Sequence, residues 1–162
     1  MLCMTNTRIA NRAGRHLVLI DIENIAATPS PSEAEVVCVL RALADAIPGF
    51  STAQRVWASS HRAALAVGCA APGDRRLWRS GRDGADLALL EVMDSEHLAE
   101  RFERVTVCSG DGIFADGVAR LAGQGVSVAV IALRGHLATR LRLAAHRVDY
   151  MAETAVTLGS AS

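Results

Sequence analysis

Three aspartates stand where an apolar strand is expected to give way to a helix. Asp21 ends the apolar run that starts at His16, and Asp111 follows the apolar run 105–108. Asp86 lies at the start of the segment Gly84-Ala-Asp-Leu-Ala-Leu-Leu-Glu91. Ligands of a parallel α/β sheet bind at the carboxyl ends of its strands, where these carboxylates are expected to converge. Mg²⁺ and Mn²⁺ prefer oxygen ligands, so the pattern predicts a divalent-cation site suited to phosphodiester chemistry.

The elements that must position these aspartates alternate along the chain. Apolar runs predict strands at 16–21, 54–58, 77–78, 104–108, 126–133 and 148–151. Helical spacing predicts helices from a cap at Ser30 or Ser32 to about residue 47, and at 61–67, 83–100, 112–122 and 137–145. The alternation favours right-handed crossovers, and hence a three-layer α/β/α, Rossmann-like domain with a mainly parallel sheet. We expect this domain at 15–152, between a flexible arm at 1–14 and a flexible tail at 153–162.

Composition excludes several classes of site. The chain has 162 residues, which is typical of one domain, and all 17 of its basic residues are arginine. Without lysine, a Walker-type phosphate loop and Schiff-base catalysis are excluded. The formal net charge is zero, so no overall field draws the protein to nucleic acid. Arginines nevertheless cluster at 75–82 and 134–147, and Arg82 and Arg134 are candidates for phosphate contacts beside the aspartates.

Cysteine spacing and hydropathy bear on metal chemistry and location. The four cysteines form no CxxC pair, which argues against a thiolate zinc site. No uncharged apolar stretch reaches the roughly 18 residues of a transmembrane helix, and residues 1–15 lack the apolar core of a signal peptide. The expected location is therefore the cytoplasm, away from membranes.

Three motifs together resemble a known family. Leu17-Val-Leu-Ile-Asp21-Ile-Glu-Asn24, Gly84-Ala-Asp86-Leu-Ala-Leu and Ser109-Gly-Asp111-Gly-Ile-Phe114 are similar, in order and approximate spacing, to the motifs of NYN domains. NYN domains are a branch of the PIN-like nuclease superfamily, and the resemblance covers roughly residues 15–151. It implies a PIN-like fold and a metal-dependent ribonuclease site built on Asp21, Asp86 and Asp111, with Asn24 and Ser109 nearby.

The chain also departs from the family pattern. Ile113 stands where many members have a second aspartate after the Ser-Gly-Asp motif. Asp116 follows three residues later on the predicted helix, about 60° around its axis, and could take over part of the role through water. The lysine often found shortly before the second aspartate is absent, and Arg82 and Asp83 stand there instead.

The expected function is hydrolysis of RNA by water activated on one or two Mg²⁺ or Mn²⁺ ions. Asp21, Asp86 and Asp111 would hold the metal with help from Asp116. Ile113 and the neutral charge leave open a catalytically weak or inactive module that binds nucleic acid or a protein partner. A phosphatase and a toxin of a toxin–antitoxin pair are further alternatives. The expected partners are single-stranded or structured RNA and a second copy of the chain in a homodimer.

Overall fold

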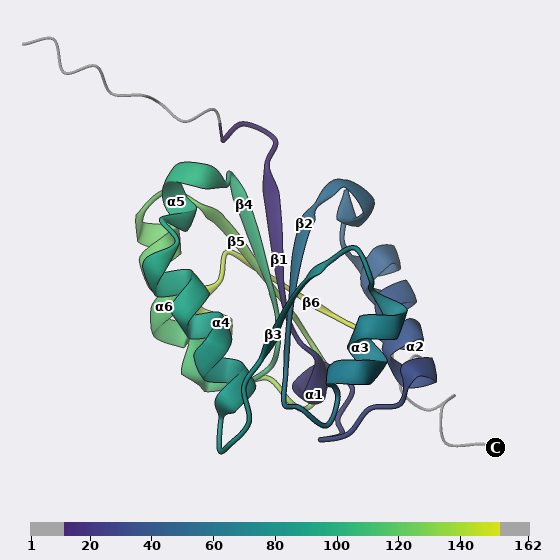
Figure 1. Cartoon of the computed structure of the whole chain (residues 1–162). Helices are drawn as coiled ribbons and strands as arrows, with labels where there is room; N and C mark the ends of the chain where they lie inside the picture. Colours follow the sequence, from purple (N-terminus) through teal and green to yellow (C-terminus); the bar gives the residue numbers. More distant parts are fainter. Residues whose placement is uncertain (1–11, 153–162) are drawn as a thin grey trace, which may run out of the picture.

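Residues 12–152, the part of the chain that the computed structural model describes, form a six-stranded sheet with helices on both faces (Figure 1). The strands are β1 (His16–Asp21), β2 (Gln54–Ser59), β3 (Arg75–Trp78), β4 (Arg104–Cys108), β5 (Ser127–Ala132) and β6 (Arg147–Tyr150). Their order is β3-β2-β1-β4-β5-β6, and every neighbouring pair is parallel. The expected Rossmann-like α/β/α fold is thus confirmed.

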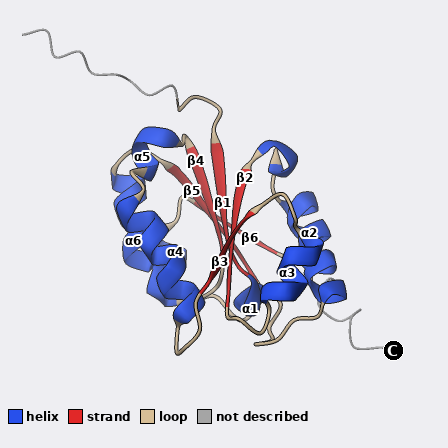
Figure 2. Ribbon diagram, in the orientation of Figure 1, coloured by secondary structure: helices blue, strands red, loops and turns tan. Residues whose placement is uncertain are grey.

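Helices cover the two faces of the sheet unequally (Figure 2). One face carries α1 (Ile22–Ile25), α2 (Glu33–Ala46) and α3 (Ala64–Ala70). The other carries α4 (Gly84–Ser95), α5 (Leu98–Arg101) and α6 (Ala115–Gly123), with α7 (Thr139–Ala144) beside α6. Each face has its own apolar core, because successive residues of a strand point to opposite sides. Within residues 12–152, no helix has the length and apolarity that crossing a membrane requires.

Helix α2 begins where its polar residues predict. Ser32 Oγ accepts a hydrogen bond from the Glu35 amide at 3.3 Å, and Glu35 Oε2 accepts one from the Ser32 amide at 2.7 Å. This capping box satisfies two donors that a helix start leaves unpaired. Behind it, Val36, Val39 and Leu43 form the buried stripe of the helix. The choice between Ser30 and Ser32 is therefore settled in favour of Ser32.

The structure differs from the expected elements in five places, one of which is the helix expected at 61–67, observed as α3 (Ala64–Ala70). The expected helix 83–100 is two helices, because His97 adopts a left-handed conformation with φ of 51° between α4 and α5. The single turn α1 follows β1 directly and was not expected. The helix expected at 112–122 starts with the 3₁₀ turn η2 (Gly112–Phe114), and a second such turn, η1 (Phe50–Thr52), precedes β2. Periodicity over a few residues is too short to predict such turns.

The strand order creates the crevice that matters for function. From β1 the chain moves to β2 and β3 on one side, and then crosses to β4, β5 and β6 on the other. The order reverses between β1 and β4, so the connections after these two strands diverge there. Ligands of open parallel sheets bind at such a switch point. The expected arm and tail lie mostly outside the described residues, which begin at residue 12 and end at 152.

Candidate functional site

Asp21 lies at the switch point because of the elements on either side of it in the chain, a strand before it and a helix after it. It is the last residue of β1, and its side chain caps the one-turn helix α1 by accepting the Asn24 amide at 3.4 Å. Its other carboxylate oxygen accepts the hydroxyl of Ser109, just past β4, at 3.0 Å. The Asp21 side chain is almost fully buried, at 3% exposure. Burial of the carboxyl raises its pKa, and the hydrogen bonds from Ser109 and Asn24 partly oppose that rise.

Asp86 faces Asp21 from the first turn of α4. A hydrogen bond between the two carboxyl groups lowers the pKa of Asp21 and raises that of Asp86. Burial raises the pKa of Asp86 to about 8, and the negative charges of Asp21, Asp111 and Asp83 add to the rise. Two carboxylates this close repel each other when both are ionised and no cation is present, so a proton shared by the pair is favoured. The buried Asp21 and the half-buried Asp86 are thus a pair whose ionised forms are both disfavoured.

Asp111 stands at the rim of the same site. It caps η2, accepting the Ile113 amide at 2.8 Å, while its own amide donates to Ser109 Oγ at 3.1 Å. Ser109 is fully buried and therefore ties Asp111 to Asp21 from beneath the site. The Asp111 carboxylate is exposed and lies near enough to raise the pKa of Asp86 through its charge.

These three aspartates line one pocket of about 230 Å³. Its wall comes from the segments that follow β1, β2, β3 and β4, as expected for the carboxyl edge of a parallel sheet. The lining residues are Asp21, Glu23, Asn24, Ser60, Arg79, Gly81, Asp83, Gly84, Ala85, Asp86 and Asp111. The convergence predicted for Asp21, Asp86 and Asp111 is present in the structure.

Both motif glycines permit close backbone contacts beside the aspartates. A Cβ at Gly84 would lie 2.2 Å from the carbonyl oxygen of Arg79, across the tight turn that leads into α4. A Cβ at Gly110 would lie 1.8 Å from the carbonyl oxygen of His136, in the loop that precedes α7. A residue with a Cβ cannot make contacts this short. Glycine is therefore required at both positions for the observed backbone conformation.

The remaining predicted site residues are not all at the pocket. Asn24 lines it, but its side-chain oxygen accepts the Gly110 amide at 2.9 Å and so ties α1 to the loop after β4. Asp116 is exposed in the first turn of α6 and does not line the pocket. Arg82 is 96% exposed, lies 3.8 Å from the Asp83 carboxylate and does not line the pocket. Arg134 lies over the Tyr150 ring, 5.1 Å from its centre, and is also absent from the lining.

Four charged residues at the site were not predicted. Glu23 lines the pocket and accepts the Ser60 amide at 2.7 Å. Asp83 lines it with a left-handed backbone, φ 55°, at the start of α4. Arg79 contributes the pocket's basic group. Arg140 lies against η2, so close that a Cβ at Gly112 would come within 2.5 Å of its Nε. Arg79 and Arg140 belong to the two arginine clusters of the sequence. This clustering was the signal that could have identified them.

The donors fit a hard divalent cation only in part. Among residues 12–152, no three Asp, Glu, His or Cys side chains lie together in an arrangement that holds a metal ion. The pair of Asp21, which is buried, and Asp86, which is half-buried, nevertheless offers only oxygen donors and lacks a nearby positive partner within the same residues, which is the donor chemistry that Mg²⁺ and Mn²⁺ prefer. Asp111 is the third carboxylate on the pocket wall.

Comparison with known proteins supports the fold alone. The sequence matches no known protein family and no curated protein. The structure resembles the crystal structure of a protein of unknown function from Vibrio parahaemolyticus RIMD 2210633, with a TM-score of 0.57 and 17% sequence identity. The match covers 88% of this chain and 96% of that chain. The resemblance to NYN domains therefore stays a prediction, and what is shown is that the chain shares the overall fold of that protein.

Proposed function

We propose that the protein is a metal-dependent ribonuclease whose site is the pocket of Asp21, Asp86 and Asp111. The observation that carries the proposal is that the buried Asp21 and the half-buried Asp86, both with raised pKa values, line one pocket with Asp111 at the switch point of the sheet. Buried carboxyl groups that repel each other lower the stability of a fold, and their presence at a ligand-binding edge favours a functional role.

The chain's own residues would prepare the site. Asp21 and Asp86 would hold Mg²⁺ or Mn²⁺, with Asp111 approaching from the rim. Ser109, buried beneath them, fixes Asp21 and Asp111 relative to each other. A bound cation would supply Lewis acidity and positive charge for phosphodiester hydrolysis. Loss of the shared proton would accompany binding, since the ion replaces it.

Two arginines other than Arg82 and Arg134 are candidates for contacts with the RNA backbone. Arg79 is on the pocket wall, with its nearest carboxylate, that of Glu91, 3.7 Å away. Arg140 lies against Gly112 of η2, the turn that Asp111 caps, although it does not line the pocket. Guanidinium groups bind phosphate oxygens well, so we assign the phosphate contacts to these two. A cytoplasmic location is part of the proposal, and it agrees with the free thiols of Cys38, Cys69 and Cys108.

A second function, binding without cleavage, is favoured by one specific observation. The Asp111 carboxylate is turned to the Ile113 amide, at the position where many NYN domains carry another acidic residue. A site with only the Asp21–Asp86 pair would bind an ion less firmly than one with more carboxylates. In this case the fold would bind nucleic acid through its arginines and leave it intact.

Cleavage of labelled RNA separates the two functions. Single-stranded and structured RNA are incubated with Mn²⁺, with Mg²⁺ or with EDTA, and the variants are Asp86→Asn and Asp45→Asn. Asp45 is an exposed residue of α2, far from the pocket, and serves as the matched control. The ribonuclease proposal expects metal-dependent products from wild type and Asp45→Asn, and none from Asp86→Asn. Salt-sensitive RNA binding with no products in any sample would establish the binding module instead.

A further inference from the structure

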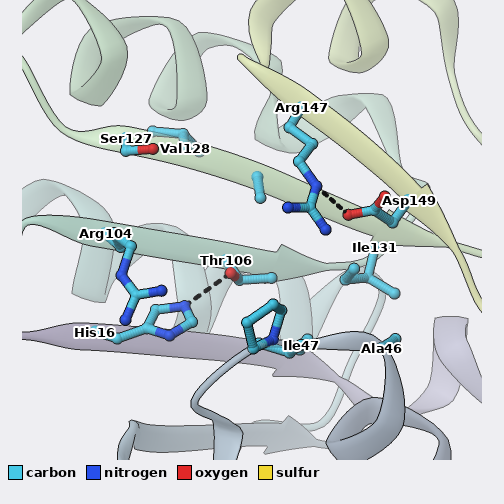
Figure 3. A pocket seen from close by; sticks show the side chains of 12 residues that line it. His16, Ala46, Ile47, Arg104, Thr106, Ser127, Val128, Ile131, Arg147 and Asp149 are labelled. Carbon is cyan, nitrogen blue, oxygen red and sulfur yellow. Dashed lines mark hydrogen bonds and ion pairs between the residues drawn. The ribbon is translucent and has the colours of Figure 1, made fainter.

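A second pocket lies at the amino half of the sheet, away from the aspartates. It has a volume of about 110 Å³ and lies on the face that carries α2 (Figure 3). The end of α2 forms one wall through Ala46, Ile47 and Pro48, and β1, β4, β5 and β6 form the floor. Liquid water occupies roughly 30 Å³ per molecule, so the space holds about three or four waters or one small ion.

The register of the sheet assembles the polar floor of this pocket. His16 pairs with Arg104, and Arg104 pairs with Ser127, so the first residues of three strands stand in one row. In the next row, Thr106 pairs with Ala129, which pairs with Arg147. Neighbours across a parallel sheet point to the same side. These rows place a group of polar side chains at one end of this sheet face. The other end of the same face is covered by an apolar core.

One buried ring nitrogen of His16 in this pocket is left without a partner within the described part of the chain. His16 is 93% buried, since its exposure is 7%. Its Nε2 is 2.8 Å from Thr106 Oγ1, whereas Nδ1 has no partner among the described residues. When Thr106 donates to Nε2, Nδ1 carries the proton and is an unpaired donor. A buried donor of this kind carries an energetic penalty unless a ligand or water accepts from it.

Positive charge is also in excess at the pocket. Within residues 12–152, Arg104 has no ion pair. Arg147 bonds Asp149 through Nε at 2.5 Å, which leaves its terminal nitrogens for another acceptor. Asp149 is the sole acid of the lining. Two guanidinium groups and one carboxylate give a net charge of +1 while His16 is neutral.

We propose that this pocket binds a small oxyanion, such as inorganic phosphate or a short carboxylate. Arg104 and Arg147 would supply the charge-assisted hydrogen bonds, and Nδ1 of His16 would donate the third. The pocket's size limits the ligand to the oxyanion group and a few further atoms. The site is independent of the aspartate pocket, and it holds whether or not the protein cleaves RNA.

Histidine NMR tests the site directly. Inorganic phosphate and butyrate are titrated separately into ¹⁵N-labelled protein, with chloride at matched ionic strength as the reference. The chain has five histidines, and His61, His97 and His136 are internal controls, whereas His146 Nδ1 accepts the amide of Val128 in the pocket lining and is not used as one. The proposal expects saturable shifts of the His16 ring nitrogens with a dissociation constant of about 1 mM or tighter for one or both anions. Shifts confined to phosphate or to butyrate identify which oxyanion fits.

Variants separate the pocket from general charge effects. Arg104→Gln and Arg147→Gln should each weaken binding about tenfold or more, because each removes a charge-assisted hydrogen bond. Arg142→Gln, an exposed arginine of α7, should leave binding unchanged, and so should Asp111→Asn. The proposal is overturned if neither anion gives a saturable His16 shift, or if Arg142→Gln reduces affinity as much as the two pocket variants do.

Discussion

The Asp86 carboxyl has a raised pKa because burial and the charge of Asp21 both penalise its ionised form. At the scale of single residues this gives a pH dependence with a definite sign. Because the folded-state pKa of about 8 exceeds the ordinary value of 3.8, the stabilisation from Asp86 is full below 3.8. It is lost as the pH rises towards 8, unless a cation is present.

Replacing Asp86 should therefore stabilise the metal-free protein at high pH. With metal chelated, we expect Asp86→Asn to melt at a higher temperature than wild type near pH 8, and the difference to shrink towards pH 4. Millimolar Mg²⁺ or Mn²⁺ should raise the melting temperature of wild type and leave that of Asp86→Asn almost unchanged. Thermal melting across pH measures both effects, and parallel pH profiles of the two proteins would contradict the shared proton.

His16 has the opposite dependence. Burial, with the nearby charge of Arg104, lowers the pKa of His16 from 6.5 to about 4. The unfolded chain then binds a proton that the folded protein does not, so stability falls as the pH drops from 6.5 to 4. Relative to His16→Gln, the free energy of unfolding of wild type should fall by about 1–3 kcal/mol as the pH drops from 6.5 to 4. Urea unfolding at several pH values measures the loss, and a constant difference between the two proteins would show that His16 is not buried as a neutral ring.

The sequence predicted those site residues whose position follows from the course of the backbone. It missed those whose contribution depends on where the side chain lies. Asp21 and Asp111 follow strands, so their place at the carboxyl edge followed from the strands alone. Arg82 and Arg134 are near the site residues in sequence, yet neither lines the pocket. The useful arginines, Arg79 and Arg140, depend on the course of a turn and a loop, which no sequence periodicity describes.

At the scale of elements, two loops meet at Gly110. The Gly110 carbonyl accepts the Ala138 amide at 2.9 Å, and the missing Cβ leaves room for the carbonyl of His136. This contact holds the segment before α7 against the start of η2, and with it Ser109 and Asp111. The motif glycine is thus explained by packing between loops and needs no contact with substrate.

Gly110→Ala should force these loops apart. We expect a loss of about 1–3 kcal/mol in the free energy of unfolding, typical of overpacking, together with weaker metal binding at Asp111. Gly123→Ala is the matched control, because a Cβ there meets nothing within 4 Å on the last residue of α6. That variant should be neutral or slightly stabilising. Denaturant unfolding measures the free energy of unfolding of both variants. Equal losses for Gly110→Ala and Gly123→Ala would refute the explanation from packing.

Strands and helices of ordinary length were predictable, because buried residues recur along them with a regular spacing. The strands 16–21 and 104–108 match β1 and β4, and the cap at Ser32 was one of two predicted candidates. The expected unbroken helix 83–100 was wrong, since the reversal at His97 requires a left-handed residue that sequence patterns do not indicate. The one-turn helix α1 was missed for a similar reason, although the aspartate that caps it was singled out.

At the scale of the whole molecule, the aspartates and the small polar pocket lie at opposite ends of one sheet. The carboxyl ends of β1 and β4 gather the acidic pocket, and the first residues of β1, β4 and β5 begin the basic one. Zero net charge thus hides an uneven distribution, which the overall composition did not predict. The homodimer expected from the sequence stays a prediction; the edge strands β3 and β6 are four residues each.

The most direct test of the account is calorimetric titration of Mn²⁺ at neutral pH in buffers of different ionisation enthalpy. We predict saturable binding to wild type with release of about one proton per ion, because the ion displaces the proton that Asp21 and Asp86 share. Asp21→Asn should abolish binding, and Asp45→Asn should preserve it. Absence of binding by wild type, or equal binding by Asp21→Asn, would contradict the claim that these carboxylates form a metal site.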